Sequence, residues 1–305
     1  MAVIAAFVLI ALAIFVRGLV ADDGDSGGSD GPKRGEDEVP VVACTPDLIE
    51  VCDALAADGL IAKDPPQLDL SGAAAPAAEI DAWITWNPAP QIANFEVQPD
   101  RVWQTPKVLG SAVEAVLIDD TSVQALPAAC RTDPSWSCLA AASPGLSVGV
   151  GDPATADGIA RLAPFARTFT TDDDYTALDT EGLVDLISSP PGDQAAAVDM
   201  AEQLTTRPGS VSMTSGPNDL LVAQTRTPQG QQRKLRVLSP SPQARLVVVV
   251  AERVDWSGAA DDLTCDPDPP DALVAPLDDL GLQPCEGKAD AALAGFLFQV
   301  QKKVG

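Results

Sequence analysis

Three segments of the chain carry the residue types that hold small anions at the N-termini of helices. They are PVVACTPDLIEV at residues 40–51, SVGVGDPATADGIARLA at residues 147–163 and SVSMTSGPNDLL at residues 210–221. The free amides at the start of a helix attract oxyanions because the helix dipole lies behind them, and nearby hydroxyl groups add donors. The candidate ligand-binding residues are Thr45, Asp152, Ala154, Thr155, Thr214, Ser215 and Gly216.

Each of these segments is predicted to be a short strand, a polar turn and a helix that starts with proline. The predicted N-caps are Thr45, Asp152 and either Ser215 or Gly216. Such residues are ordinary helix caps, so every joint also has a purely structural interpretation. Asp152 would in addition compete for the free amides and repel an anion. The anion site therefore requires that the three helix N-termini meet at one cleft.

The composition excludes several kinds of catalysis. The chain has no histidine, which removes Ser-His-Asp and Cys-His mechanisms and zinc sites built on imidazole. No serine in a GxSxG pattern lies at a predicted strand-to-helix elbow, and no motif pairs two carboxylates. We therefore expect no enzyme activity, no cofactor and no metal.

Aspartate runs and tryptophans are further candidates for binding. The acidic runs Asp119–Asp120 and Asp172–Asp174 are expected to be solvated loops rather than cation sites, because consecutive side chains on a strand point to opposite faces. Trp83, Trp86 and Trp103 are expected in the core, with the lining of a cleft as the alternative.

The charge balance restricts the partners. Nineteen basic residues stand against 44 acidic residues, which gives a formal net charge of −25. Binding to nucleic acid needs a clustered positive surface, so nucleic acid is excluded as a partner. The same charge argues against docking on anionic lipid heads. It is typical of an exported protein that electrostatic repulsion keeps soluble.

The six cysteines are Cys44, Cys52, Cys130, Cys138, Cys265 and Cys285. The pairs Cys130–Cys138 and Cys265–Cys285 each enclose a polar loop with proline, which indicates disulfides formed outside the cytoplasm. The pair Cys44–Cys52 follows by elimination. A helix that begins at Pro46 would separate these two Cα atoms by about 9 Å, whereas a disulfide usually needs less than about 7 Å. Either the strand end folds back over the helix, or this pair is wrong.

The N-terminus contains a segment that suits a membrane. Residues 2–16 are all apolar, and GLVA follows after Arg17. Residues 1–21 are predicted to be an uncleaved transmembrane anchor, with a signal segment as the alternative, and residues 22–39 an acidic Gly/Ser linker. Arg17 would place the main domain in the cytoplasm by the positive-inside rule. The cysteines carry more weight, so the predicted location is the cell membrane, single-pass, with an extracellular main domain.

Strands and helices alternate along the rest of the chain, so the fold class is α/β. Residues 81–86 alternate as a strand, and residues 102–119 contain two apolar runs. The four consecutive valines within residues 245–255 suit a strand that is covered on both faces, as in a parallel sheet. Helices are predicted at residues 180–188, 193–205 and 289–303, and a lobe-crossing or edge segment at residues 224–236.

The order of these pieces resembles the type 2 periplasmic solute-binding proteins of ABC transporters, in particular a divergent extracellular branch without the von Willebrand A domain. VVACTPDLIEVCDAL resembles the first strand and helix of lobe one. AVLIDD, followed by SVGVGDPATADGIARL, resembles the hinge strand and the start of lobe two. SVSMTSGPNDLLVAQ resembles the late part of lobe two, and LSPSPQARLVVVVAE resembles the return to lobe one.

The resemblance implies a two-lobed α/β domain over residues 40–305, with lobe one at about 40–118 and 225–305 and lobe two at about 119–224. It implies that the three joints meet in an interlobe cleft that holds a small polar or anionic solute without catalysis. An ABC transporter is then a candidate partner. The alternative is a degenerate cleft, in a cell-envelope scaffold that binds another envelope protein. A secreted carboxylate-dependent hydrolase is a second alternative.

Overall fold

The computed structural model describes residues 39–142, 145–150, 152–170, 180–187, 201, 204–206, 211–256, 258, 260–265 and 268–304. The predicted anchor, almost all of the predicted linker and most of the predicted helix at residues 193–205 lie outside these residues. Within the described part, no helix has both the length and the apolar character that crossing a membrane requires. The structure described below belongs to one compact unit, Glu38–Gly305.

A mixed sheet forms the centre of this unit, with the strand order β1-β2-β7-β3-β5-β4. These strands are β1 (Val42–Cys44), β2 (Ala82–Trp86), β7 (Arg245–Glu252), β3 (Lys107–Ile118), β5 (Met213–Pro217) and β4 (Val148–Gly149). Two short strands, β6 (Arg236–Leu238) and β8 (Gln283–Pro284), also pair with β3. The mixed α/β class predicted from the sequence is confirmed.

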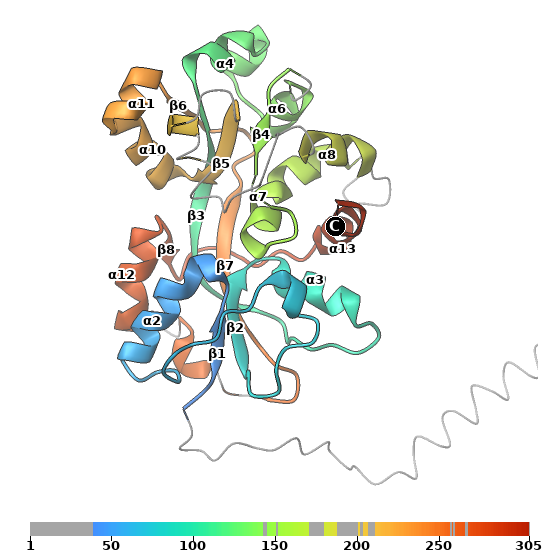
Figure 1. The fold of residues 1–305 in the computed structure, drawn as a ribbon, viewed down its shortest axis with the longest axis vertical. Coiled ribbons are helices and arrows are strands. Elements are labelled where there is room, and N and C mark those ends of the chain that lie inside the picture. The colour runs from blue at the N-terminus through green and yellow to red at the C-terminus, as the bar shows by residue number, and fades with distance from the viewer. Residues whose placement is uncertain are drawn as a thin grey trace, which may run out of the picture. The chain divides into compact units, whose positions relative to one another are not determined.

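Strand β3 connects two parts of the sheet (Figure 1). Its first half, Lys107–Val113, pairs with β7 and β8, and its second half, Glu114–Ile118, pairs with β5 and β6. The two apolar runs seen in the sequence are thus one strand of 12 residues. This arrangement is the one expected of a hinge strand, whereas the predicted lobe boundaries stay a prediction.

Strand β7 corrects one expectation. Its residues Leu246–Glu252 are all buried, as the valine run predicts. However, β7 is antiparallel to both of its neighbours, β2 and β3, and not part of a parallel sheet. An apolar run reports that both faces of a strand are covered, and helices can cover either kind of sheet. The parallel pairs are β1 with β2 and β4 with β5.

The α-helices of the described part are α2 (Ile49–Ala57), α3 (Ala89–Glu96), α4 (Asp120–Ala125), α5 (Ala128–Thr132), α6 (Trp136–Ala142), α7 (Ala156–Ala166), α8 (Thr180–Ile187), α10 (Asn218–Arg226), α11 (Pro228–Arg233), α12 (Asp271–Asp279) and α13 (Ala294–Val304). Short 3-10 turns are η1 (Pro46–Leu48), η2 (Leu70–Gly72), η3 (Arg167–Phe169) and η4 (Asp261–Leu263). Helix α2 packs on α12, and α3 packs on α13, on the opposite side of β1 and β2 in Figure 1.

Two helical segments differ from their predicted limits. The segment predicted to cross between lobes or to form an edge, residues 224–236, instead contains the end of α10, all of α11 and the start of β6. Helix α13 begins at Ala294, later than predicted. The preceding Asp290 makes tertiary contacts, accepting a hydrogen bond from Asn87 at its carbonyl and pairing with Arg167 through its carboxylate.

All three cysteine pairs form disulfides. The Cys44–Cys52 pair is confirmed, with a Cα–Cα distance of 6.2 Å. The helix does not run on from Pro46: a 3-10 turn comes first, α2 begins at Ile49, and the end of β1 lies over the first turn of α2. The pairs Cys130–Cys138 and Cys265–Cys285 are also formed, with Cα–Cα distances of 5.8 Å and 5.4 Å.

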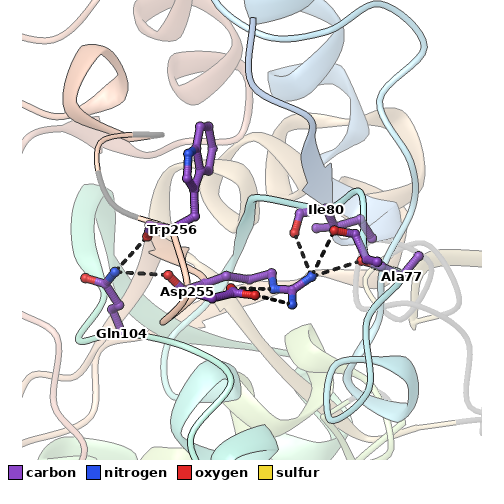
Figure 2. A network of polar contacts seen from close by, with 7 residues as sticks. Ala77, Ile80, Gln104, Asp255 and Trp256 are labelled. Atoms are coloured by element: carbon purple, nitrogen blue, oxygen red, sulfur yellow. Dashed lines mark hydrogen bonds and ion pairs between the residues drawn. The ribbon is translucent and has the colours of Figure 1, made fainter. Parts of the chain in front are cut away.

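A polar network around Arg253 ties the loop before β2 to the end of β7 (Figure 2). The Arg253 guanidinium donates to backbone carbonyls in the segment Ala77–Ile80 and pairs with Asp255 at 2.8 Å. Gln104 donates to the carbonyls of Arg253 and Trp256, at 3.0 and 2.8 Å. All three side-chain nitrogens of Arg253 thus donate to oxygens of the protein, so this cation has a structural role.

Candidate functional site

The three predicted strand-to-helix joints do lie close together, around the buried side chain of Arg161 on α7. Its Nη1 donates a hydrogen bond of 2.7 Å to the carbonyl oxygen of Ser215 on β5. A Cβ atom added to Gly216 would lie 2.6 Å from the same nitrogen, so glycine allows this approach. Asp47, which lies within the first joint, interacts electrostatically with Arg161.

The hydroxyl groups of Thr45, Thr214 and Ser215 bond to, or lie beside, other groups of the protein. Thr45 donates to the carbonyl oxygen of Ile84 at 3.1 Å, and Thr214 donates to that of Gly149 at 2.7 Å. Both threonines are buried. The buried Ser215 hydroxyl neighbours the carboxyl group of Glu114. Thr45 and Thr214 therefore have no proton left to donate to a ligand.

The start of α7 differs from its predicted geometry. The helix begins at Ala156 and its cap is Thr155, whose hydroxyl accepts from the Gly158 amide at 3.3 Å. Asp152 is not the cap: its carboxylate accepts from the Ala154 amide at 2.9 Å, inside the preceding turn. A Cβ atom at Gly158 would lie 2.0 Å from the Asp152 carbonyl oxygen, so the turn folds back onto the helix and delays its start.

The third joint also has a different cap. Ser215 and Gly216 belong to β5, which continues to Pro217, and α10 begins at Asn218 with Pro217 at its N-cap. Their backbone pairs with β3, Val116 opposite Ser215 and Ala115 opposite Gly216. Backbone pairing with β3 therefore extends β5 through Ser215 and Gly216, the two residues predicted to cap the helix.

A carboxylate of the chain itself occupies the N-terminus of α7. Asp69 accepts hydrogen bonds from the amides of Ala156, at 3.0 Å, and Leu70, at 2.7 Å. Burial raises the pKa of Asp69 above its usual range. Together with the contact between Asp152 and Ala154, this arrangement fills from within the position that the sequence suggested for an external anion. The role of the seven residues in ligand binding stays a prediction.

The sequence did not single out Asp47, Glu114 and Arg161, which interact electrostatically where the three joints meet and are called the Arg161 cluster. Asp47 accepts a hydrogen bond of 2.6 Å from the indole of Trp86, while burial and the neighbouring Asp157 raise the pKa of Asp47 to about 7. Burial raises the pKa of Glu114 on β3 to about 8. Charged residues inside apolar runs, such as Glu114 in SAVEAVLI, were the available signal, because such groups need an internal partner.

Four tryptophans are buried, and the indole nitrogen of each donates a hydrogen bond within the protein. Trp83 and Trp103 are core residues, with ring centroids 5.5 Å apart and both indole nitrogens bonded to backbone carbonyls. Trp86 is buried and bonded to Asp47. Trp136, which the sequence did not single out, donates to the Pro242 carbonyl and lines a cavity. Of the two acidic runs, which were expected to be solvated loops, Asp119 caps α4 and Asp172–Asp174 lie outside the described residues.

The cavity beside Trp136 has a volume of about 660 Å³. One wall comes from the start of α3, the approach to β7 and the segment before α13; its lining residues include Asn87, Pro88, Ser241, Arg245, Val247, Lys288, Asp290 and Leu293. The other wall comes from α6 and α7; its lining residues are Trp136, Ser137, Ala160, Ala163, Pro164, Arg167 and Thr168. None of the seven predicted ligand-binding residues, all of them in the described part, belongs to this lining.

Positive charge gathers at this cavity. Arg167 pairs with Asp290 at 2.5 Å, and Arg245 pairs with Glu286 at 2.9 Å. Among the described residues, Lys288 makes neither an ion pair nor a side-chain hydrogen bond. The cavity and its ion-pair partners thus hold three cations and two carboxylates. Helix α7 contributes to both places: Ala160 and Ala163 line the cavity, whereas Arg161 bonds to Ser215 on β5 and is not part of the lining.

Comparison with known proteins identifies the fold. No family model matches the chain, and no curated protein matches it in sequence. A periplasmic thiamin-binding protein has a TM-score of 0.55 at 12% identity, over 89% of this chain and 98% of the other. Iron-bound HitA from Pseudomonas aeruginosa has a TM-score of 0.53 at 12% identity, over 88% of this chain and 100% of the other. The chain therefore has the fold of the type 2 periplasmic solute-binding proteins.

Proposed function

We propose that this protein binds a small polar or anionic solute, without catalysis, in the cavity between α6–α7 and the segments around α3, β7 and α13. The observation that carries the proposal is the cavity of about 660 Å³, whose lining residues come from segments of both predicted lobes. A cavity of this size suits a small molecule. Its position between the two predicted lobes is the position of a ligand in a hinged binding protein.

The chemistry of the lining supports binding rather than reaction. Acid-base hydrolysis by carboxylates needs two such groups facing one another. Among the described lining residues, Asp290 is the one carboxylate, and it is paired with Arg167. The fold adds support, since two of the similar structures are by name a thiamin-binding protein and an iron-bound protein.

The setting of the domain is part of the proposal. We infer that residues 1–21 anchor the protein in the cell membrane and that residues 22–39 hold the domain outside the cell. The apolar N-terminal run supports the anchor, and three disulfides support an oxidising compartment. An ABC transporter is the proposed partner if the bound solute is taken up.

A thermal-shift screen of the full chain with organic anions, amino acids and sugars tests the proposal. A ligand at 100 times its Kd stabilises the folded state by about 2.7 kcal/mol, so a real ligand raises the Tm visibly. Ala163→Trp fills the cavity and should abolish the shift. Ala57→Trp is the matched control, because Ala57 is exposed and lies on α2, outside the cavity lining.

One observation favours the scaffold as a second candidate. Asp69 and Asp152 fill the helix N-terminus that the fold would offer to an anion. If no solute class raises the Tm, and Ala163→Trp behaves like the wild type throughout, solute binding is contradicted. The domain would then be a binding fold whose cleft is closed by its own side chains, in a protein that binds another envelope protein.

A further inference from the structure

The charges around the cavity specify the kind of ligand it takes. Resting on the proposed solute binding, we infer that the ligand is a small organic monoanion with an apolar body, such as an aryl or alkyl carboxylate. Three observations carry this inference: one uncompensated cation, two cations that already have partners, and a large apolar share of the lining.

The uncompensated cation is Lys288. The carboxylates of Asp290 and Glu286 neutralise Arg167 and Arg245, at 2.5 Å and 2.9 Å. The described residues therefore leave one positive charge at the cavity. A ligand with a single negative charge balances it, whereas a dianion would have to displace one of the internal carboxylates.

The remaining lining suits an apolar body. Trp136 and Leu293 are buried side chains that contribute to the wall, and α7 adds Ala160, Ala163 and Pro164. An inorganic anion would leave this apolar surface without an apolar partner. An apolar group placed here removes both its own surface and that of the wall from water, at about 25 cal/mol for each Å².

The net charge of the whole chain and the charges at the cavity act on an anionic ligand in opposite directions. The chain carries a net charge of −25, which repels anions at long range. At physiological ionic strength, however, charges more than about 8 Å away are largely screened. The groups within the cavity wall then decide which charge binds, and these groups favour one negative charge.

Isothermal titration of the full chain with four probes tests the inference. The probes are benzoate, benzyl alcohol, benzylamine and sulfate, which separate the negative charge from the apolar body. We expect benzoate to bind more tightly than each of the other three. Lys288→Met should weaken benzoate binding by about 3- to 10-fold. Lys63→Met is the matched control, since it removes an exposed lysine outside the cavity and changes the net charge equally.

A second variant should act in the opposite direction. Asp290→Asn leaves Arg167 without its partner and retains an oxygen that can accept from the Ala292 amide. We expect it to tighten benzoate binding several-fold.

The possible outcomes separate the inference from the proposed function. Equal binding of benzoate and sulfate, or tighter binding of benzylamine, would overturn the monoanion while solute binding stands. The same holds if another solute binds in the cavity and benzoate does not, or if Lys288→Met has no effect on benzoate. If no probe and no member of the wider solute screen binds, both are overturned.

Discussion

Two carboxyl groups of this fold, those of Glu114 and Asp47, are buried and have pKa values near neutral pH. Burial raises the pKa of Glu114 to about 8, and neither of its oxygens makes a hydrogen bond of standard geometry among the described residues. Burial, assisted by Asp157, raises the pKa of Asp47 to about 7. Both groups therefore hold their protons in the folded state over a pH range in which the unfolded chain has lost them.

This difference gives stability an unusual dependence on pH. The folded pKa of Glu114 lies above the unfolded value of about 4.3, so its contribution to stability is fully present below that unfolded value. The contribution is lost as the pH rises toward about 8. Within this window each such group lowers the free energy of unfolding by about 1.4 kcal/mol per pH unit. We therefore expect the wild-type protein to be more stable at pH 5.5 than at pH 8.5.

Glu114→Gln tests the origin of this dependence. Glutamine cannot ionise, so the variant should lose less stability than the wild type between pH 5.5 and pH 8.5. Urea unfolding at several pH values measures the difference, and Glu79→Gln, at an exposed position, is the matched control. Parallel curves for the wild type and Glu114→Gln would show that Glu114 does not hold its proton in the folded state.

At the scale of the elements, α7 has the central position. Arg161 on this helix contacts β5, and Ala160 and Ala163 on the same helix line the cavity. Its N-terminus is held by Thr155 from its own chain segment and by Asp69 from a distant one. A shift of α7 would therefore change the cavity and the Arg161 cluster together.

The close contact between Gly158 of α7 and the turn before the helix predicts the effect of replacing this glycine. A Cβ atom at Gly158 would lie 2.0 Å from the backbone oxygen of Asp152, and a backbone atom cannot move aside without displacing the turn. Gly158→Ala should reduce the free energy of unfolding by on the order of 2–4 kcal/mol. Gly145→Ala is the control, because its nearest contact is 3.9 Å away. Equal stabilities of the two variants in urea unfolding would contradict the packing at this turn.

At the scale of the whole molecule, like charges repel throughout the domain. The formal net charge of −25 opposes the compact state, because folding brings the carboxylates closer together. The 19 basic residues are too few to compensate the 44 acidic residues, so more than half of the carboxylates have no compensating cation even if every basic residue is paired.

Screening should therefore stabilise this protein. Raising sodium chloride from about 20 mM to about 500 mM shortens the Debye length from about 20 Å to about 4 Å. We expect the Tm to rise by about 2–5 °C. Calorimetry measures the shift, and an uncharged osmolyte at matched osmolality is the control. A Tm that falls with salt would mean that ion pairs outweigh the repulsion.

The sequence predicted local structure well where the chain itself supplies the signal. Strand β2, helix α8, the covered faces of β7 and the pairs Cys130–Cys138 and Cys265–Cys285 follow from periodicity, turn residues or spacing. The pair Cys44–Cys52 followed by elimination alone. The failures are nonlocal. The antiparallel direction of β7 depends on which strands lie beside it, and the cap of α7 moved to Thr155 because the preceding turn packs against Gly158.

The candidate site shows the same division. The amino-acid sequence by itself determined the α/β class, the absence of histidine chemistry and the three joints, because these depend on residue types and short spacings. Only the tertiary structure decided that Asp69, far away in sequence, fills the start of α7. It also brought α6 and α7 opposite the segment before α13 to enclose the cavity beside Lys288. A cavity consists of surfaces from distant segments, and no local pattern records which of them meet.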